Sequence, residues 1–373
     1  MKKKIILLEC GIVICLGILF CFHLKNKNNF QKNNVTNKNN SIAIMIKESG
    51  ETDYTKYSSN SIPIGNYILN EEKTYCENNG KVSSYDNANG AVSFLIDGTD
   101  KCYLYFDYFN NDLSSIIEEK TNTTNYSSQD NSIYEITDSD GYFYRFAGKD
   151  PDNYICLDNL KSGDCAANDL YRIIYYDYGV IIQDSIRVIK NDFYGSYAFD
   201  TNMSNIWYNS SLKKIFENNF YLSLPTKVQE YITESFVTSY EYNQTLIDTY
   251  VANKLVENEL GNYANEETLI ALMTPGDFVN GVRDEDCSHD FSFARYRSNS
   301  SCYENNWLYL NELEWTVAPS NDSKFAVFIY KGSPYLNAYG VSNPAKVRPV
   351  FSMYVSNIIS GNGSKISPWR FEF

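Results

Sequence analysis

The placement of the cysteines behind an N-terminal apolar run is the feature that most constrains this chain. Residues 5–22 are almost entirely apolar and follow three lysines, as in an export signal or a membrane anchor. Three cysteines lie inside the run, and the other six follow it: Cys76, Cys102, Cys156, Cys165, Cys287 and Cys302. An even set of cysteines behind an export signal indicates disulfides formed in an oxidising compartment. Sequence proximity predicts the pairs Cys76–Cys102, Cys156–Cys165 and Cys287–Cys302, because each then closes a loop within one predicted module.

We expect residues 1–22 to form a retained transmembrane anchor. The apolar run approaches the roughly 20 residues that span a bilayer, and no small-residue cleavage site follows it. The lysines before it predict a single-pass protein with a cytoplasmic N-terminus and an extracellular C-terminal part. A cleaved signal peptide is the alternative. Lipidation at Cys21 is disfavoured because bulky residues precede it.

Glu9 is a carboxylate five residues into the apolar run. Type IV pilins carry a glutamate at this spacing, which leaves a pilin-like filament subunit as one alternative. Pilins also require a glycine just before the run, where this chain has Lys4. We therefore interpret Glu9 as a side chain near the headgroup boundary that snorkels or becomes protonated.

The charge distribution excludes one class of partner. The net charge is −14 overall, and residues 1–47 are basic at +7, so residues 48–373 carry −21. Such an acidic surface repels phosphate backbones, which argues against nucleic acid as a partner. The 33 Tyr and 21 Phe indicate a β-rich fold with many half-buried aromatic positions.

Changes in composition divide the chain. Residues 23–40 are rich in Asn and Lys without apolar periodicity, which is typical of a solvated stalk. Short alternating stretches separated by turn signals then predict a small all-β, membrane-proximal module over residues 41–109. Residues 110–132 are polar, with one short helical stretch at 113–120, and we interpret them as an interdomain linker. Residues 133–373 form the larger predicted domain.

The larger domain combines strands and helices. Residues 170–190 read as a hairpin, and Asn209 or Ser210 can cap a helix whose apolar residues share one face up to Phe220. Further helical stretches are expected from Pro225 and over residues 246–260, and short strands return after Thr268. The order β, α, β predicts an α+β fold.

Several blocks of this chain, taken in order, resemble a family of exported proteins of uncharacterised function that is common in gut-dwelling, low-GC Gram-positive bacteria. These blocks include YRFAGKDPDNYICL (144–157), LYRIIYY (170–176), IRVIKND (186–192), ALMTPGDFV (271–279), NNWLYL (305–310), VRPVF (347–351) and GNGSKISPW (361–369). The block with Trp315, followed by a strand and Arg348, is more distantly similar to bacterial C-type-lectin-like domains. The resemblance implies a β module followed by a C-type-lectin-like domain, and it supplies no catalytic residues. This chain departs from it at Ser352, where a more apolar strand is expected.

Residues for catalysis or metal binding are scarce. His289 is the only histidine after residue 23, and it stands in a polar loop, where a surface role is expected. The sequence predicts no catalytic residue, metal ligand or cofactor. Oxygen-rich loops at 138–141, 150–153 and 284–286 lack the spacing of a calcium loop and are interpreted as solvated turns.

The tryptophans and one arginine have structural interpretations. Trp207, Trp307 and Trp315 are expected to pack in the core. Arg348 lies in an apolar strand, where an arginine usually pairs with an inward carboxylate such as Glu314.

These observations favour a membrane-anchored extracellular protein that binds rather than catalyses. Its expected ligand is a glycan or a surface protein. An exported glycosidase-like hydrolase that uses two carboxylates is the first alternative, and the filament subunit is the second.

Overall fold

The structure is a computed structural model. It describes residues 41–49, 51–58, 67–70, 72–86, 91–95, 100–121, 131–137, 142–158, 164–178, 183–243, 255, 258–259, 262–282, 298–329, 331–332 and 336–373. The predicted anchor at residues 1–22, with Glu9, and the predicted stalk at 23–40 lie outside this part of the chain. Within the described ranges, no helix is long and apolar enough to span a membrane.

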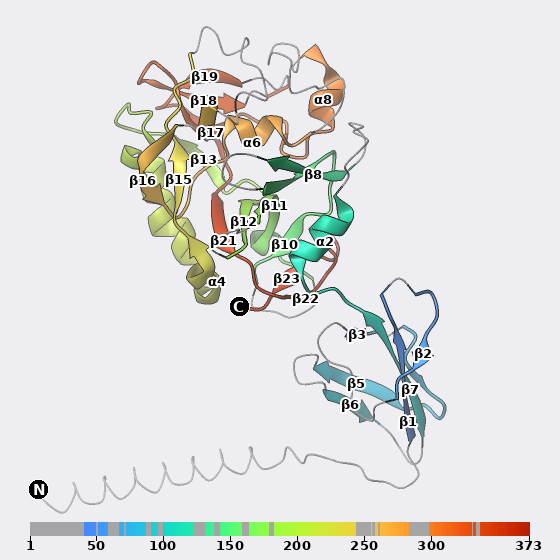
Figure 1. Ribbon diagram of the computed structural model, residues 1–373. Helices are drawn as coiled ribbons and strands as arrows, with labels where there is room; N and C mark the ends of the chain where they lie inside the picture. Colours follow the sequence, from blue (N-terminus) through green and yellow to red (C-terminus); the bar gives the residue numbers. More distant parts are fainter. Residues whose placement is uncertain are drawn as a thin grey trace, which may run out of the picture. The chain divides into compact units, whose positions relative to one another are not determined.

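The chain divides into two compact units, Met1–Phe109 and Asn110–Phe373, here called unit 1 and unit 2. Both are shown as ribbons in Figure 1. Strands account for more of the described residues than helices do, so the fold is mixed and mostly β.

Unit 1 is built from short strands. They are β1 (Ser41–Lys47), β2 (Thr55–Lys56), β3 (Tyr67–Leu69), β4 (Tyr75–Cys76), β5 (Lys81–Asp86), β6 (Ala91–Leu95) and β7 (Lys101–Tyr108). One sheet has the order β2-β1-β7-β3, with β4 also paired to β7, and β5 and β6 form a separate hairpin.

The core of unit 1 follows from the alternation in β1 and β7. The two strands run parallel, with Ile44 opposite Leu104 and Ile46 opposite Phe106. Because opposed residues point to the same face, these four side chains meet, and all are less than 10% exposed. They form the core cluster of unit 1 together with Leu69.

Unit 2 contains short helical segments and many strands. The helical segments are α2 (Leu113–Lys120), η1 (Ala167–Asp169), η2 (Trp207–Asn209), α3 (Ser211–Ile215), η3 (Phe216–Tyr221), α4 (Thr226–Tyr231), α6 (Pro275–Val279) and α8 (Ser300–Glu304). The strands are β8 (Ser132–Thr137), β9 (Tyr142–Ala147), β10 (Tyr154–Cys156), β11 (Leu170–Asp177), β12 (Ser185–Lys190), β13 (Gly195–Ala198), β14 (Ile232–Thr233), β15 (Ser235–Thr238), β16 (Tyr263–Thr268), β17 (Glu314–Pro319), β18 (Phe325–Ile329), β19 (Leu336–Gly340), β20 (Pro344–Val347), β21 (Val350–Tyr354), β22 (Ile358–Ser360) and β23 (Arg370–Phe371).

The predicted stretch 110–132 contains helix α2 at the residues expected for it, Leu113–Lys120. Asp112 caps helix α2 by accepting hydrogen bonds from the backbone of the first turn. Leu113 and Ile117 on this helix are only 1% and 0% exposed. The backbone of Asn111 accepts a hydrogen bond from Ile358 at 2.9 Å. The predicted helix is therefore capped at its N-terminus and contributes two buried side chains to unit 2.

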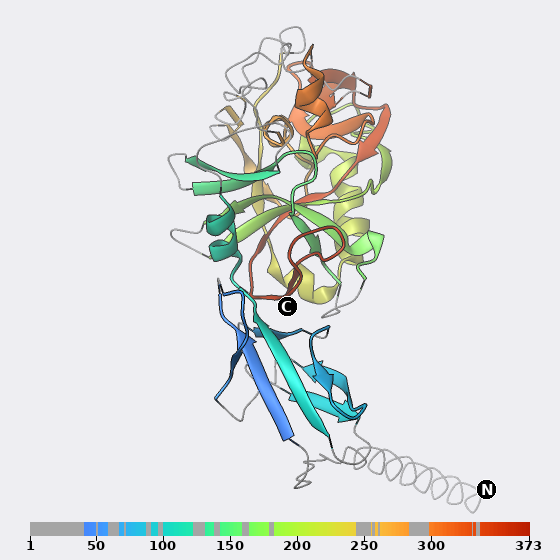
Figure 2. The ribbon, with the colours of Figure 1, turned by 90° about the vertical axis from the view of Figure 1, so that its right-hand side faces the viewer.

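The larger sheet of unit 2 has the strand order β14-β21-β12-β11-β9-β8, with β10 also paired to β11. One face is covered by the helical segment α3–η3, where Phe220 contacts the rings of Tyr171 and Phe351. Figure 2, turned from the view of Figure 1, shows this yellow-green segment beside the sheet. Ser210, one of the two predicted candidates, caps the segment by accepting a hydrogen bond from the Lys213 N–H. The predicted helix over residues 246–260 lies mostly outside the described residues.

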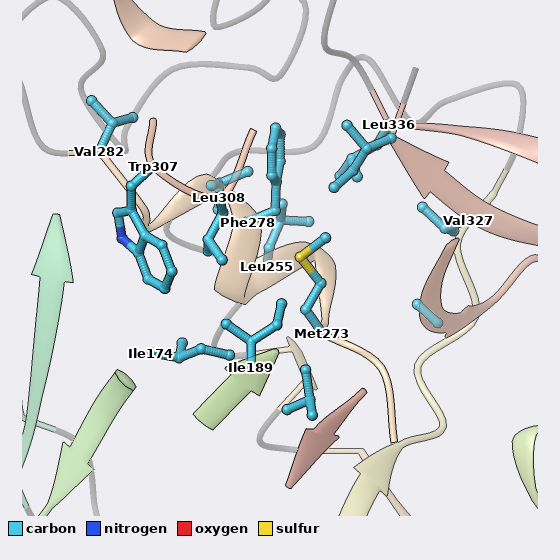
Figure 3. Packing of buried hydrophobic residues seen from close by; sticks show 14 of the residues in the cluster. Ile174, Ile189, Leu255, Met273, Phe278, Val282, Trp307, Leu308, Val327 and Leu336 are labelled. Carbon is cyan, nitrogen blue, oxygen red and sulfur yellow. The ribbon is translucent and has the colours of Figure 1, made fainter. Parts of the chain in front are cut away.

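The other face of this sheet packs against α6 and the second sheet, whose order is β13-β20-β17-β18-β19. Figure 3 shows this core, which contains Ile174 and Ile189 of the larger sheet, Phe278 of α6, and Trp307. Val327 and Leu336 of the second sheet belong to the same cluster. This cluster therefore lies on the α6 side of the larger sheet, beside the cavity described below.

Candidate functional site

Two of the three predicted cysteine pairs are disulfides in the structure. Cys76 and Cys102 lie directly opposite each other on β4 and β7, with Cα atoms 4.0 Å apart. Cys156 and Cys165 form the second disulfide, with a Cα separation of 5.9 Å. Cys302 is disulfide-bonded and fully buried. Cys287 and the neighbouring His289 lie outside the described residues.

The tryptophans and Arg348 have the structural roles predicted for them. Trp207, Trp307 and Trp315 are at most 3% exposed. Arg348 forms a two-pronged ion pair with Glu314, with Nε to Oε1 at 2.8 Å and Nη2 to Oε2 at 3.0 Å. Both side chains are buried, so this pair belongs to the core of unit 2 rather than to a ligand site.

The side chains of the loop at residues 150–153 form hydrogen bonds with other residues of the protein. Asp150 accepts hydrogen bonds from Tyr154 at 2.6 Å and from Arg172 at 3.0 Å, and Asn153 accepts one from Arg172 at 2.8 Å. The other two acidic loops considered for calcium, at residues 138–141 and 284–286, lie outside the described residues. Within the described ranges, two sets of side chains have ligand atoms close enough together to hold a metal ion. Each set includes the two cysteines of a disulfide.

A cavity of about 340 Å³ in unit 2 is the strongest candidate for a ligand site. Its floor is one row of residues that lie opposite one another on five neighbouring strands. Arg145 pairs with Tyr175, Tyr175 with Arg187, Arg187 with Ser352, and Ser352 with Thr233. Side chains of directly opposed residues point to the same face of a sheet. All five line the cavity.

A bulge in β11 sets this row. The pairing of β11 with β12 shifts between Ile173 and Tyr175, so that Ile174 is the extra residue. Such an extra residue allows two consecutive side chains to lie on the same side of the sheet. Ile174 enters the core cluster, and Tyr175, which packs partly against that cluster, lines the cavity next to it.

The carboxylate of Asp277 bridges the guanidinium groups of the two floor arginines. Its carboxylate accepts a hydrogen bond from Arg145 Nη1 at 3.0 Å and lies 3.4 Å from Arg187 Nε. Thr274 and Asp277 form a capping box at the start of α6, in which each side chain accepts from the other's backbone N–H. Burial alone would raise the pKa of Asp277, but Arg187, Arg145 and the Thr274 N–H outweigh it and hold the pKa below its usual range.

Glu259 is the second buried carboxyl group of the cavity. It is 5% exposed and accepts hydrogen bonds from the Tyr242 hydroxyl at 2.6 Å and from the Gly276 N–H at 2.9 Å. Burial raises the pKa of Glu259 to about 7, with the charge of Asp277 adding to the effect and these hydrogen bonds opposing it. Its carboxyl group therefore exchanges a proton near neutral pH.

The remaining wall of the cavity combines hydroxyl groups, carboxylates and one exposed ring. Phe236 on β15 is 46% exposed. Asp177 and Glu234 supply negative charge. The serines and threonines of the lining are Ser185, Thr233, Ser235, Thr238, Thr274 and Ser352.

A pattern in the sequence could have predicted the residues of the cavity floor. Arg145 and Arg187 are each embedded in an apolar strand, which is the pattern that correctly identified Arg348 as a partner of a buried carboxylate. Ser352, which interrupts the expected apolar strand, lies opposite Arg187 at the floor. A polar residue is accommodated on β21 there because it faces the cavity.

The arrangement favours binding over covalent chemistry. Asp277 is held by two guanidinium groups and a backbone N–H, so it is a poor nucleophile for a glycosidic carbon. Glu259 is the better candidate for an acid, because its pKa lies near the pH of the surroundings. Uncommitted donors, hydroxyl groups and a planar ring are the usual means of holding a polar ligand.

Comparison with known proteins identifies no relative: no family model, no curated protein and no solved structure matches the chain.

Proposed function

We propose that this chain is a membrane-anchored extracellular binding protein, and that the cavity of unit 2 holds a residue of a glycan. The observation that carries the proposal is the floor of Arg145, Tyr175 and Arg187 beside the exposed ring of Phe236. Sugars present hydroxyl groups around their edges and apolar C–H faces, so they match polar side chains combined with an aromatic ring. The lower end of the usual size range for ligand pockets is about 300 Å³, which this cavity slightly exceeds.

The proposal also includes a fold class for unit 2 and a location for the protein. A C-type-lectin-like class for unit 2 is supported by the order of the Trp315 strand β17, the strand β18 and the buried Arg348. The extracellular location is supported by the two disulfides and by the apolar run at residues 5–22.

The test is retention of soluble residues 41–373 on a panel of immobilised glycans. We expect Phe236→Ala to abolish retention, because it removes the ring against which a sugar face would pack. Leu222→Ala is the matched control, since Leu222 is 64% exposed and is not among the residues that line the cavity. Equal retention of the wild type and the Phe236→Ala variant would contradict this site.

A hydrolase is the second candidate, because two buried carboxyl groups with pKa values shifted in opposite directions line one cavity. In that case the wild type releases shortened glycans, and Glu259→Gln abolishes release while retention continues. Retention without any released product supports the binding function.

A further inference from the structure

Arg145 has hydrogen-bond donors to spare at the floor of the cavity. Its guanidinium group carries five N–H bonds. In the part of the chain that the structure describes, it makes one hydrogen bond, from Nη1 to Asp277 Oδ1, and its guanidinium carbon lies 5.0 Å from the centre of the Tyr175 ring. Arg145 is only 8% exposed, and it lines the cavity. The Arg145 nitrogens that make no hydrogen bond are not among the fully buried atoms, so they are open to the cavity and can donate to an acceptor of a ligand.

The charges next to Arg145 indicate what that acceptor is. Two guanidinium groups, those of Arg145 and Arg187, share the single carboxylate of Asp277. Arg145 uses one N–H of its guanidinium fork, that of Nη1, on this carboxylate. A carboxylate is the planar, two-oxygen group that matches a guanidinium fork best.

The rest of the lining excludes a bare anion as the preferred ligand. Asp177 and Glu234 also line the cavity, and they repel a ligand that is negative throughout. The same carboxylates accept hydrogen bonds from hydroxyl groups. Ser185, Ser235 and Ser352 add further hydroxyl partners. The lining therefore suits a ligand with one carboxylate and several hydroxyl groups.

We propose that the cavity recognises an acidic sugar, a glycan residue of the uronic acid type, whose carboxylate is bound by Arg145. This inference rests on the glycan-binding function proposed above and names its ligand class. The hydroxyl groups of the sugar bind the carboxylates and serines of the wall, and Phe236 packs against its ring.

The test compares sugars that differ only in the charged group. Soluble residues 41–373 are titrated calorimetrically with glucuronate and glucose, with galacturonate and galactose, and with the methyl esters of both acids. A hydrogen bond to a charged group contributes about 1.5 to 3 kcal/mol, so we expect the matching acid to bind about 10- to 100-fold more tightly than its neutral counterpart and its ester.

Substitutions at Arg145 then test whether this residue causes the preference for acidic over neutral sugars. Arg145→Gln should reduce the acid-to-neutral ratio to about 1, and Arg145→Lys, which keeps the charge without the planar fork, should give an intermediate ratio. Leu222→Ala should keep the wild-type ratio. If Arg145→Gln does not fold, the affinities of the wild type for each acid and its methyl ester still decide whether the carboxylate is recognised.

The outcomes separate this inference from the proposed function. Equal affinity for acids, esters and neutral sugars would overturn acid recognition and leave glycan binding intact. Binding of a peptide with a free C-terminal carboxylate, with no binding of any sugar, would overturn both.

Discussion

Unit 1 and unit 2 are both rich in strands and tyrosine, but different interactions stabilise them. The core cluster of unit 1 consists of five buried residues of the described chain, and the Lys47–Asp107 ion pair of this unit is partly exposed. One cluster of unit 2 alone contains sixteen buried residues, and the Arg348–Glu314 pair is almost fully buried. Charges can be buried at low cost only where good geometry and further hydrogen bonds compensate for lost water. We infer that unit 1 depends on its disulfide and unit 2 on its core and its buried ion pairs.

The largest expected effect comes from the buried ion pair of unit 2. Arg348→Met removes both bonds to Glu314 and leaves a buried, uncompensated carboxylate. We expect unit 2 to lose about 3 to 5 kcal/mol in free energy of unfolding, measured by urea denaturation. Lys331→Ala is the control, because it breaks an exposed pair with Glu312 that should contribute about 0 to 1 kcal/mol. Similar losses for both variants would show that burial does not distinguish these pairs.

Removal of the disulfide of unit 1 should give the second-largest loss of stability. The 26-residue separation between Cys76 and Cys102 predicts a loss of about 3.5 kcal/mol when both are changed to alanine. The 9-residue separation between Cys156 and Cys165 predicts about 2.6 kcal/mol for the corresponding change in unit 2. Because the core of unit 1 is small, we expect the first change to unfold unit 1 at physiological temperature, measured by amide hydrogen exchange of β1 and β7. Protection of β1 and β7 that survives this change would contradict the comparison between the units.

The helix α2 tests where unit 2 begins. Leu113→Ala removes a fully buried side chain, and we expect a loss of about 3 kcal/mol in the thermal transition of unit 2. Glu119→Ala on the exposed side of the same helix is the control and should change stability little. A neutral Leu113→Ala would indicate that residues 110–121 act as a linker after all.

The smallest effect is the pH dependence that arises from Glu259. Its pKa is about 7 in the folded state, above its ordinary value of 4.5. The folded state therefore holds a proton that the unfolded state releases, and stability falls as the pH rises through 7. Between pH 6 and pH 8 the expected fall is about 1 kcal/mol.

Glu259→Gln should remove this fall, because the amide does not titrate. The measurement is the melting temperature of both proteins at each pH. An equally steep fall in Glu259→Gln would assign the pH dependence to another group.

Local patterns in the sequence predicted the interactions that each depend on one stretch of chain. Alternation predicted strands in the first module, where Ile44 and Ile46 are buried while Ile42 is exposed. Asn209 and Ser210 were the two candidates for a helix cap, and Ser210 is the one that caps. Arg348 was paired with Glu314 because an arginine in an apolar strand needs a buried carboxylate. These features follow from the side chain and its neighbours in sequence.

The parallel pairing of β1 with β7 and the floor of the cavity were not predicted. Arg145, Tyr175 and Arg187 meet because of strand order and register, which no single segment specifies. Helix α2 was predicted at residues 113–120, but two apolar residues in a polar stretch give too weak a periodic signal to indicate that it packs within unit 2. The third cysteine pair and the anchor remain predictions.

The bulge at Ile174 has a consequence for recognising this cavity in other chains. A sequence that lacks residue 174 can pair β11 with β12 regularly and still place Tyr175 opposite Arg187. A sequence of the same length whose strand pairs without the bulge would instead place residue 174 opposite Arg187 and turn the tyrosine to the other face. When such chains are aligned, a one-residue gap here is therefore compatible with an intact cavity, whereas a gap-free alignment with the tyrosine retained does not by itself establish one.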